Sequence, residues 1–224
     1  MSKKGFIILS WLLIILVGPI TLLVNTDIAS LLASPLGTIN FFQRLTGMLG
    51  FSFLFVQLLL GSYMNFWQRY LGAKTFRYHV IEGLVSYGLF LGHPLLYVVF
   101  TYQLVGKLTT FILPNLDINT PVYELYLTYG RIGFLLLTIG VTAGLLRNKP
   151  FLRAHWRKFH ILNYFAFFFV AVHAWNVGTD ARAFPFSFLY WIAIVVITAT
   201  VFRRFVYPRF KDFLVSRQTP ETSL

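Results

Sequence analysis

Long apolar runs alternate along this chain with short connections that carry charged or turn-forming residues. An α-helix needs about 20 mostly apolar residues to cross the hydrocarbon core of a bilayer. Six runs approach that length, and the fourth is the shortest. The pattern predicts membrane-spanning helices at Gly5–Val24, Leu45–Asn65, His79–Gln103, Gly130–Leu146, Phe159–Asn176 and Phe186–Phe205.

These runs predict an all-α membrane protein built as one six-helix bundle. We expect residues 1–206 to form the transmembrane domain and residues 207–224 to form a short polar tail. A nucleotide-binding domain needs on the order of 100 residues, so the tail is too short to be one. The sequence shows no convincing internal repeat.

The first run follows Lys3 and Lys4 in the manner of a signal peptide, but it is longer than the roughly 7 to 15 residues of a signal-peptide core. We therefore expect it to be a retained anchor. With six spans, the connections on one side carry fifteen of the nineteen Lys and Arg residues. Cytoplasmic connections are enriched in these residues, so both termini are predicted to be cytoplasmic, in a cell (inner) membrane.

The composition agrees with a bilayer as solvent. The chain has 224 residues, of which 57% are hydrophobic and 12% charged, and its mean hydropathy is +0.70. The net charge of +12 is explained by the basic connections, and no DNA- or RNA-binding motif accompanies it. We therefore expect contact with anionic lipid and no nucleic-acid partner. Cysteine is absent, which excludes disulfides, Fe–S clusters and covalently attached haem.

Histidines carry the main functional signal. Four of the five lie in or at the edge of apolar runs, namely His79 and His93 in the third run and His160 and His173 in the fifth. Ionisable groups in a membrane span are costly and usually mark an ion, proton or cofactor site. The alternative is that each imidazole simply packs and hydrogen-bonds between helices, which is less natural for two pairs than for one residue.

The spacing of the four histidines arranges them in two levels. His79 and His93 are 14 residues apart and His160 and His173 are 13 apart, which corresponds to about 21 Å and 19.5 Å of helical rise. The two spans run in the same direction, so His79 is expected level with His160, and His93 level with His173. Each level can hold one haem iron between two imidazoles, which favours electron transfer over oxygen binding.

One geometric problem remains in this assignment. At about 100° per residue, 14 residues fall about 40° short of four turns, whereas 13 fall about 140° short. His160 and His173 must then approach from different sides of their helix, or the helix must be rewound locally. His155 lies five whole turns from His173, but its neighbours are charged, and we expect it to be exposed.

The same residues resemble a known family. Histidines 14 apart on the third helix and 13 apart on the fifth, with Trp156-Arg157-Lys158-Phe159-His160 leading into the latter, are similar to the ferric reductase-like transmembrane domain. This superfamily includes ferric reductases, NADPH oxidases and the haem-binding membrane subunit of the bacterial methionine sulfoxide repair system. The resemblance covers Leu45 to Phe205. It implies two b-type haems, an inner one held by His79 and His160 and an outer one held by His93 and His173.

The resemblance also implies electron transfer across the membrane. Electrons would pass from a cytosolic flavoprotein reductase or a quinol to an outer-face acceptor, with ferric iron favoured. Ferric reductases and NADPH oxidases usually continue into a flavin and NAD(P)H domain, which this sequence lacks. The donor would then be a separate component. Support of periplasmic methionine sulfoxide reduction is the alternative within the family, and two histidines on the third helix favour the diheme ferric-reductase core.

Three charged residues near these levels are candidate contributors. Arg157 at the inner level and Arg131 at the outer level have the charge to pair with haem propionates, although membrane topology explains them equally well. Glu82, one turn beyond His79, is a candidate hydrogen-bond acceptor for a ligand imidazole. A histidine-lined transporter or proton channel without haem is the competing function from another class.

Overall fold

The computed structural model describes residues 2–106, 113–117 and 119–210. In this part of the chain every regular element is a helix. Their bounds are α1 Lys3–Asn25, α2 Ile28–Leu32, α3 Pro35–Ser62, α4 Met64–Leu71, α5 Thr75–Val105, α6 Val122–Leu145, α7 Trp156–His160, α8 Leu162–Val177, the 3₁₀ turn η1 Asp180–Arg182, α9 Phe186–Val201 and the π-helix η2 Phe202–Val206.

Six helical stretches are long and apolar enough to cross a membrane, which confirms the predicted all-α, six-helix fold class of a multi-pass membrane protein. They are Lys3–Asn25, Pro35–Ser62, Thr75–Val105, Val122–Leu145, Trp156–Val177 and Phe186–Phe210. Of the predicted tail over 207–224, residues 207–210 continue the last helix and residues 211–224 lie outside the described part, as does Lys107.

Two helices begin earlier than their hydropathy predicts. α3 begins at Pro35 rather than near Leu45, because the Ser34 hydroxyl accepts a hydrogen bond from the Gly37 amide and Pro35 suits the first helical turn. α6 begins at Val122 rather than near Gly130, and so it is not the shortest span. Polar residues in these first turns lower the local hydropathy without disfavouring the helix.

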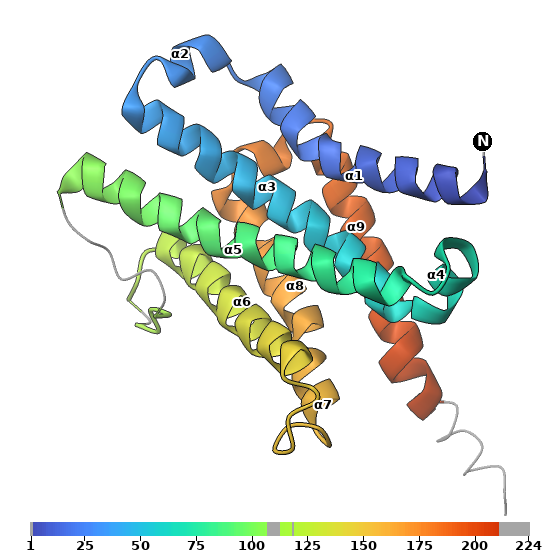
Figure 1. The fold of residues 1–224 in the computed structure, drawn as a ribbon. Helices are drawn as coiled ribbons and strands as arrows, with labels where there is room; N and C mark the ends of the chain where they lie inside the picture. Colours follow the sequence, from blue (N-terminus) through green and yellow to red (C-terminus); the bar gives the residue numbers. More distant parts are fainter. Residues whose placement is uncertain (1, 107–112, 118, 211–224) are drawn as a thin grey trace, which may run out of the picture.

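Four helices form the centre of the bundle (Figure 1). α3 packs along α5, and α6 packs along α8. α5 also contacts α6, and α8 also contacts α3, so α5 and α8 stand at opposite corners of a four-helix arrangement. α1 and α9 pack against the α3 side of this group. The two histidine-bearing helices therefore face each other across the centre.

A cluster of aromatic side chains joins α3, α8 and α9. Phe51 lies 5.5 Å from Phe167, 5.6 Å from Phe186 and 5.6 Å from Tyr190, measured between ring centres. These four rings are buried, and aromatic pairs at such distances add stabilisation beyond the area they bury. In contrast, α5 has few buried residues and presents Leu84, Val85 and other apolar side chains to the outside, as a lipid-facing helix does.

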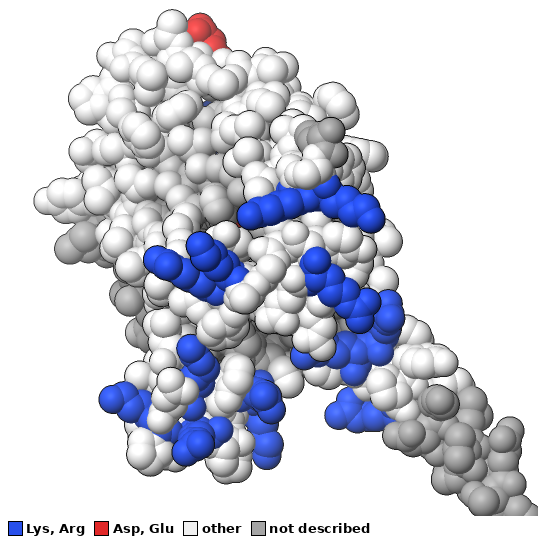
Figure 2. Space-filling model, turned by 45° about the vertical axis from the view of Figure 1, so that its right-hand side comes forward, with Lys and Arg blue, Asp and Glu red and all other residues white. Residues whose placement is uncertain are grey.

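Lys and Arg side chains gather toward one end of the molecule, where α4, α7 and η2 lie (Figure 2). We refer to this end as the basic end. The gathering agrees with the asymmetry counted in the sequence, and the cytoplasmic placement of the basic end stays a prediction.

At the opposite end a buried ion pair ties three segments together. Arg44 of α3 makes two hydrogen bonds to Asp180 of η1, at 2.6 and 2.5 Å, and a third to the Thr26 hydroxyl at 2.7 Å. The Asp180 side chain is only 8% exposed. A bidentate arginine–carboxylate pair fixes geometry as well as charge, so this contact holds the α1–α2 junction, α3 and the α8–α9 connection in one arrangement.

Removing one partner of this pair tests its structural role. Asp180→Ala leaves the Arg44 side chain, which is 21% exposed, without its counter-charge. We expect a loss of about 1.5 to 3 kcal/mol in stability, as for a hydrogen bond to a charged group. The combined Arg44→Met and Asp180→Leu variant should recover much of that loss, because it leaves no unpaired charge. Thermal unfolding of the purified protein in detergent gives the measurement, and an Asp180→Ala protein as stable as the wild type contradicts the expectation.

Candidate functional site

The four intramembrane histidines form two pairs between α5 and the α7–α8 segment. The ring centres of His79 and His160 are 6.2 Å apart, at the basic end, and those of His93 and His173 are 6.3 Å apart, toward the opposite end. The ring planes cross at 78° and 76°. We call them the inner pair and the outer pair. The structure thus brings together the same partners that helix spacing matched in the sequence.

The ring separation can be compared with that of a metal held between two imidazoles. With a metal–nitrogen bond of about 2 Å and a nitrogen about 1.1 Å from the ring centre, two imidazoles on opposite sides of one metal have centres about 6 Å apart. Both pairs meet this condition. No cluster of three or more His, Cys, Asp or Glu suited to a metal ion occurs among the described residues. Each level therefore brings two imidazoles together at this separation, with no third His, Cys, Asp or Glu grouped beside them in the described part of the chain.

Each of the four imidazoles rests against a glycine of the neighbouring helix. A Cβ atom built on Gly47 or Gly61 of α3 would lie 2.9 or 3.0 Å from Cε1 of His93 or His79. One on Gly130 or Gly144 of α6 would lie 2.7 or 3.1 Å from Nδ1 of His173 or His160. Contacts this short require the ring to move. Glycine at these positions provides the space that the rings occupy.

The glycines also uncover hydrogen-bond acceptors. Nδ1 of His93, His160 and His173 lies 2.8, 2.8 and 3.0 Å from the carbonyl oxygens of Gln43, Gly140 and Tyr126. Each of these carbonyls belongs to the residue four positions before the contacting glycine. A carbonyl only accepts, so Nδ1 carries the proton and Nε2 is left with its lone pair, which is the form that binds a metal.

His79 departs from this rule. By analogy its acceptor would be the carbonyl of Gln57, four residues before Gly61, but its Nδ1 is buried without a hydrogen-bond partner. The Gln57 side chain instead donates to the His79 carbonyl at 2.9 Å and lies 3.5 Å from His79 Nε2. The inner pair is therefore held less fully than the outer pair.

A break in the fifth span resolves the 13-residue spacing. α7 ends at His160 and α8 begins at Leu162, with a three-residue turn in which the Tyr164 amide donates to the Ile161 carbonyl at 3.0 Å. His160 and His173 both contact α6, at glycines 14 residues apart, so they lie on the same side. An unbroken helix would point them about 140° apart. The local rewinding that the spacing required is thus located at Ile161.

Two arginines near the inner pair lie over aromatic rings that in turn lie beside the histidines. Arg157 is exposed and lies over the ring of Trp156, 5.4 Å from its centre, and Trp156 in turn lies 5.7 Å from His160. On the other side, Arg147 lies 5.0 Å from the centre of Phe76, which is 6.4 Å from His79. The structure does not bring Arg157 against an imidazole, and it adds Arg147, which the sequence treats only as a topology signal.

Arg131 near the outer pair already has a partner. Its Nη1 donates to Glu124 at 2.5 Å, one α6 residue to another, and it lies within electrostatic range of His173. Its charge is thus largely matched before any ligand binds. Glu82 does not accept a hydrogen bond from His79 Nδ1, which has no partner. His155 is exposed, as its charged neighbours predict.

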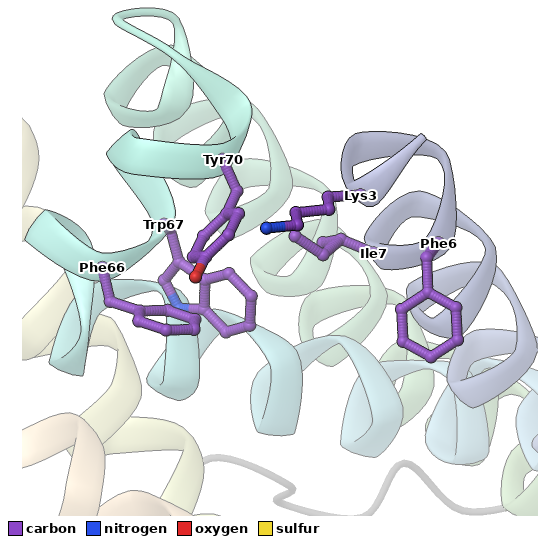
Figure 3. A pocket seen from close by; sticks show the side chains of 6 residues that line it. All are labelled: Lys3, Phe6, Ile7, Phe66, Trp67 and Tyr70. Carbon is purple, nitrogen blue, oxygen red and sulfur yellow. The ribbon is translucent and has the colours of Figure 1, made fainter. Parts of the chain in front are cut away.

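One pocket, between α1 and α4, lies away from the histidines (Figure 3). It has a volume of about 500 Å³ and is lined by Lys3, Phe6 and Ile7 of α1 and by Phe66, Trp67 and Tyr70 of α4. In the close-up the Lys3 ammonium group and the Tyr70 hydroxyl point toward the same space. Lys, Trp and Tyr side chains in this combination are typical of a membrane interface.

Sequence reasoning missed the four glycines, although a signal for them exists. Gly47 and Gly61 are 14 residues apart, as are Gly130 and Gly144, which matches the spacing of His79 and His93. The α3–α5 and α6–α8 helix pairs therefore repeat one arrangement of glycines followed by histidines. The repeat lies in the spacing of a few residues rather than in overall similarity, which is why the sequence shows no repeat by inspection.

Comparison with protein-family models, with curated proteins and with solved structures finds no match to this chain.

The glycine contacts make a prediction that needs no bound cofactor. In Gly130→Ala the added methyl group lies 2.7 Å from His173 Nδ1, and we expect overpacking to cost about 1 to 3 kcal/mol. Gly88→Ala is the matched control, because nothing lies within 4 Å of its Cβ position and alanine favours a helix by about 1 kcal/mol. Thermal unfolding in detergent compares them, and equal stability of the two variants contradicts the close contact.

Proposed function

We propose that this chain is the membrane component of a ferric-reductase-like oxidoreductase that carries electrons across a cell membrane through two non-covalent b-type haems. The observation that carries the proposal is the repeated histidine geometry, with ring centres 6.2 and 6.3 Å apart at two levels. A structural role for the histidines explains a single contact, but it gives no reason for two pairs with nearly the same ring separation, in which every imidazole contacts a glycine of a flanking helix.

The residues of the chain would hold and tune each haem. His79 with His160 and His93 with His173 would bind the iron from both sides, which leaves no open position for oxygen. The backbone acceptors at Gln43, Gly140 and Tyr126 hold the proton on Nδ1, which would leave Nε2 free to bind the iron and would make the imidazole a stronger ligand. When bound, the haem iron supplies one-electron redox chemistry.

The flanking charges fit the proposal at the inner level. Arg147 and Arg157 form no ion pair with an acidic residue among the described side chains, so their charges are available to haem propionates or to an acidic donor protein. At the outer level Arg131 would have to exchange Glu124 for a propionate. We propose a cytosolic flavoprotein reductase or a quinol as donor and an outer-face acceptor such as ferric iron.

A proton relay or transporter is supported less well by the same geometry. His79 and His93 are about 21 Å apart along α5. Between them Glu82 is the only acidic residue of α5. Tyr87, also between them, stacks on Phe134 of α6, and its hydroxyl donates a hydrogen bond to Thr138. A relay works through short polar steps, whereas electrons need only well-placed cofactors.

Haem content and histidine variants test the proposal directly. Wild-type protein produced with ample haem is expected to contain two haems per chain and to show the reduced-minus-oxidised spectrum of a b-type cytochrome. His93→Ala or His173→Ala should remove the outer haem, and His79→Ala or His160→Ala the inner one, so that each variant keeps about one. A colourless wild-type protein would falsify the proposal and favour the relay.

His155→Ala is the matched control for these four variants. It removes the same side chain from an exposed position of the α6–α7 connection, so both haems should remain. Loss of haem from His155→Ala to the same extent as from His160→Ala would show that general destabilisation, rather than ligation, explains the losses.

The unequal support of the two pairs predicts unequal affinities. His79 lacks the Nδ1 hydrogen bond that the other three imidazoles make, and loss of such a bond typically weakens metal binding 10- to 100-fold. A His93→Ala/His173→Ala chain, which keeps the inner pair, should therefore bind haem about 10 to 100 times more weakly than a His79→Ala/His160→Ala chain. Haem titration of both proteins measures this, and tighter binding by the inner pair contradicts it.

A further inference from the structure

A second pocket opens at the basic end, where α3 meets the last helix. It has a volume of about 400 Å³ and is lined by Ser62 and Tyr63 at the end of α3 and by Thr200, Arg203 and Arg204 around η2. Every residue that lines it carries a polar group, whereas the pocket between α1 and α4 is lined mainly by aromatic and aliphatic side chains. It contains none of the residues assigned to the histidine pairs.

The lining contains no acidic group, and its hydroxyl groups, those of Ser62, Tyr63 and Thr200, already make hydrogen bonds within the protein. The two guanidinium groups therefore provide its free donors. Neither arginine takes part in the ion pairs found among the described residues, which are Arg44–Asp180 and Arg131–Glu124. Arg204 donates one bond, to the Ser62 carbonyl at 3.2 Å. A guanidinium group has five N–H donors, so most remain available. Two guanidinium groups in one pocket match a phosphate group, which arginine binds through paired hydrogen bonds.

The backbone at this position is unusual. Phe202–Val206 forms a π-helix inside an otherwise α-helical segment, and such wide turns are rare and frequently occur at functional sites. Consecutive side chains on a regular α-helix diverge by about 100°. The π-helix provides a turn in which both Arg203 and Arg204 reach the same pocket.

The side chains around the pocket favour the phosphate of a lipid headgroup over that of a soluble compound. Phe202 and Val206, on the same π-helix, are 54% and 46% exposed, and Tyr207 is 54% exposed. Apolar side chains in this position, at the end of a membrane span, contact acyl chains, while basic residues contact headgroups. The pocket therefore presents a phosphate site with an apolar surface beside it. A small soluble phosphate compound has no acyl chains to contact this apolar surface.

We propose that this pocket binds the phosphate of one anionic phospholipid, with the acyl chains along the exposed face of η2. Ser62 links the pocket to the bundle, since its hydroxyl lies 2.6 Å from the Tyr164 hydroxyl of α8 and its chain neighbour is Gly61. The bound lipid would thus border the inner pair. The proposal does not depend on the haem assignment.

Lipid titration of the detergent-solubilised full-length protein, followed by native mass spectrometry, tests the site. We expect one phosphatidylglycerol molecule per chain to bind at least tenfold more tightly than phosphatidylcholine. Arg203→Gln/Arg204→Gln should abolish that preference, while Arg203→Lys/Arg204→Lys, which keeps both charges, should retain part of it. Unchanged phosphatidylglycerol binding by the Gln variant overturns the proposal.

Two controls separate the pocket from general surface charge and from soluble phosphate. Arg153→Gln/Arg209→Gln removes two exposed cations that do not line the pocket, and this variant should retain the preference for phosphatidylglycerol. If it loses the preference as fully as Arg203→Gln/Arg204→Gln does, general surface charge explains the binding and the proposed site is overturned. Glycerol phosphate should compete only weakly. Competition at concentrations as low as those of the lipid overturns the assignment to a phospholipid.

Discussion

A buried imidazole N–H needs an acceptor, and a helix in a bilayer has already used its carbonyls for its own hydrogen bonds. A second bond to one of those carbonyls is possible only where no side chain covers it. Glycines on α3 and α6 create these openings, and three of the four histidines use them. The arrangement of the four central helices follows, because a histidine-bearing helix must lie directly beside a glycine-bearing one.

The same constraint explains why some helices carry the contacting glycines and others carry the histidines. α3 and α6 supply glycines and acceptors, whereas α5 and the α7–α8 segment supply the rings, and α5 and α8 stand at opposite corners. Two similar helix pairs thus meet so that rings from one face rings from the other. The outer helices α1 and α9 and the Arg44–Asp180 contact stabilise this group from outside. Arg44 directly follows Gln43, whose carbonyl is the acceptor for His93, so this contact also fixes the backbone beside the outer pair.

The fold class and the pairing of the histidines follow from apolar run lengths and from about 1.5 Å of rise per residue, both of which are local properties of a helix. The hydropathy pattern does not predict the helix starts at Pro35 and Val122, because the capping residue and the polar residues of the first turns lower the local hydropathy. The contacts of Gly47 and Gly130, and the position of Arg147 over Phe76, depend on which helices become neighbours. That information is not contained in the pattern of a single helix.

The interruption at Ile161 distinguishes one of the four central helical segments from the others. Between their contacting residues α3, α5 and α6 are continuous, so each must keep a separation close to whole turns, and each uses 14 residues. The α7–α8 segment resets its rotation at the break and therefore accommodates 13. Among these four segments, the separation of contacting residues departs widely from whole turns in this one alone, and the turn at Ile161 offsets the rotation so that both imidazoles stay against α6.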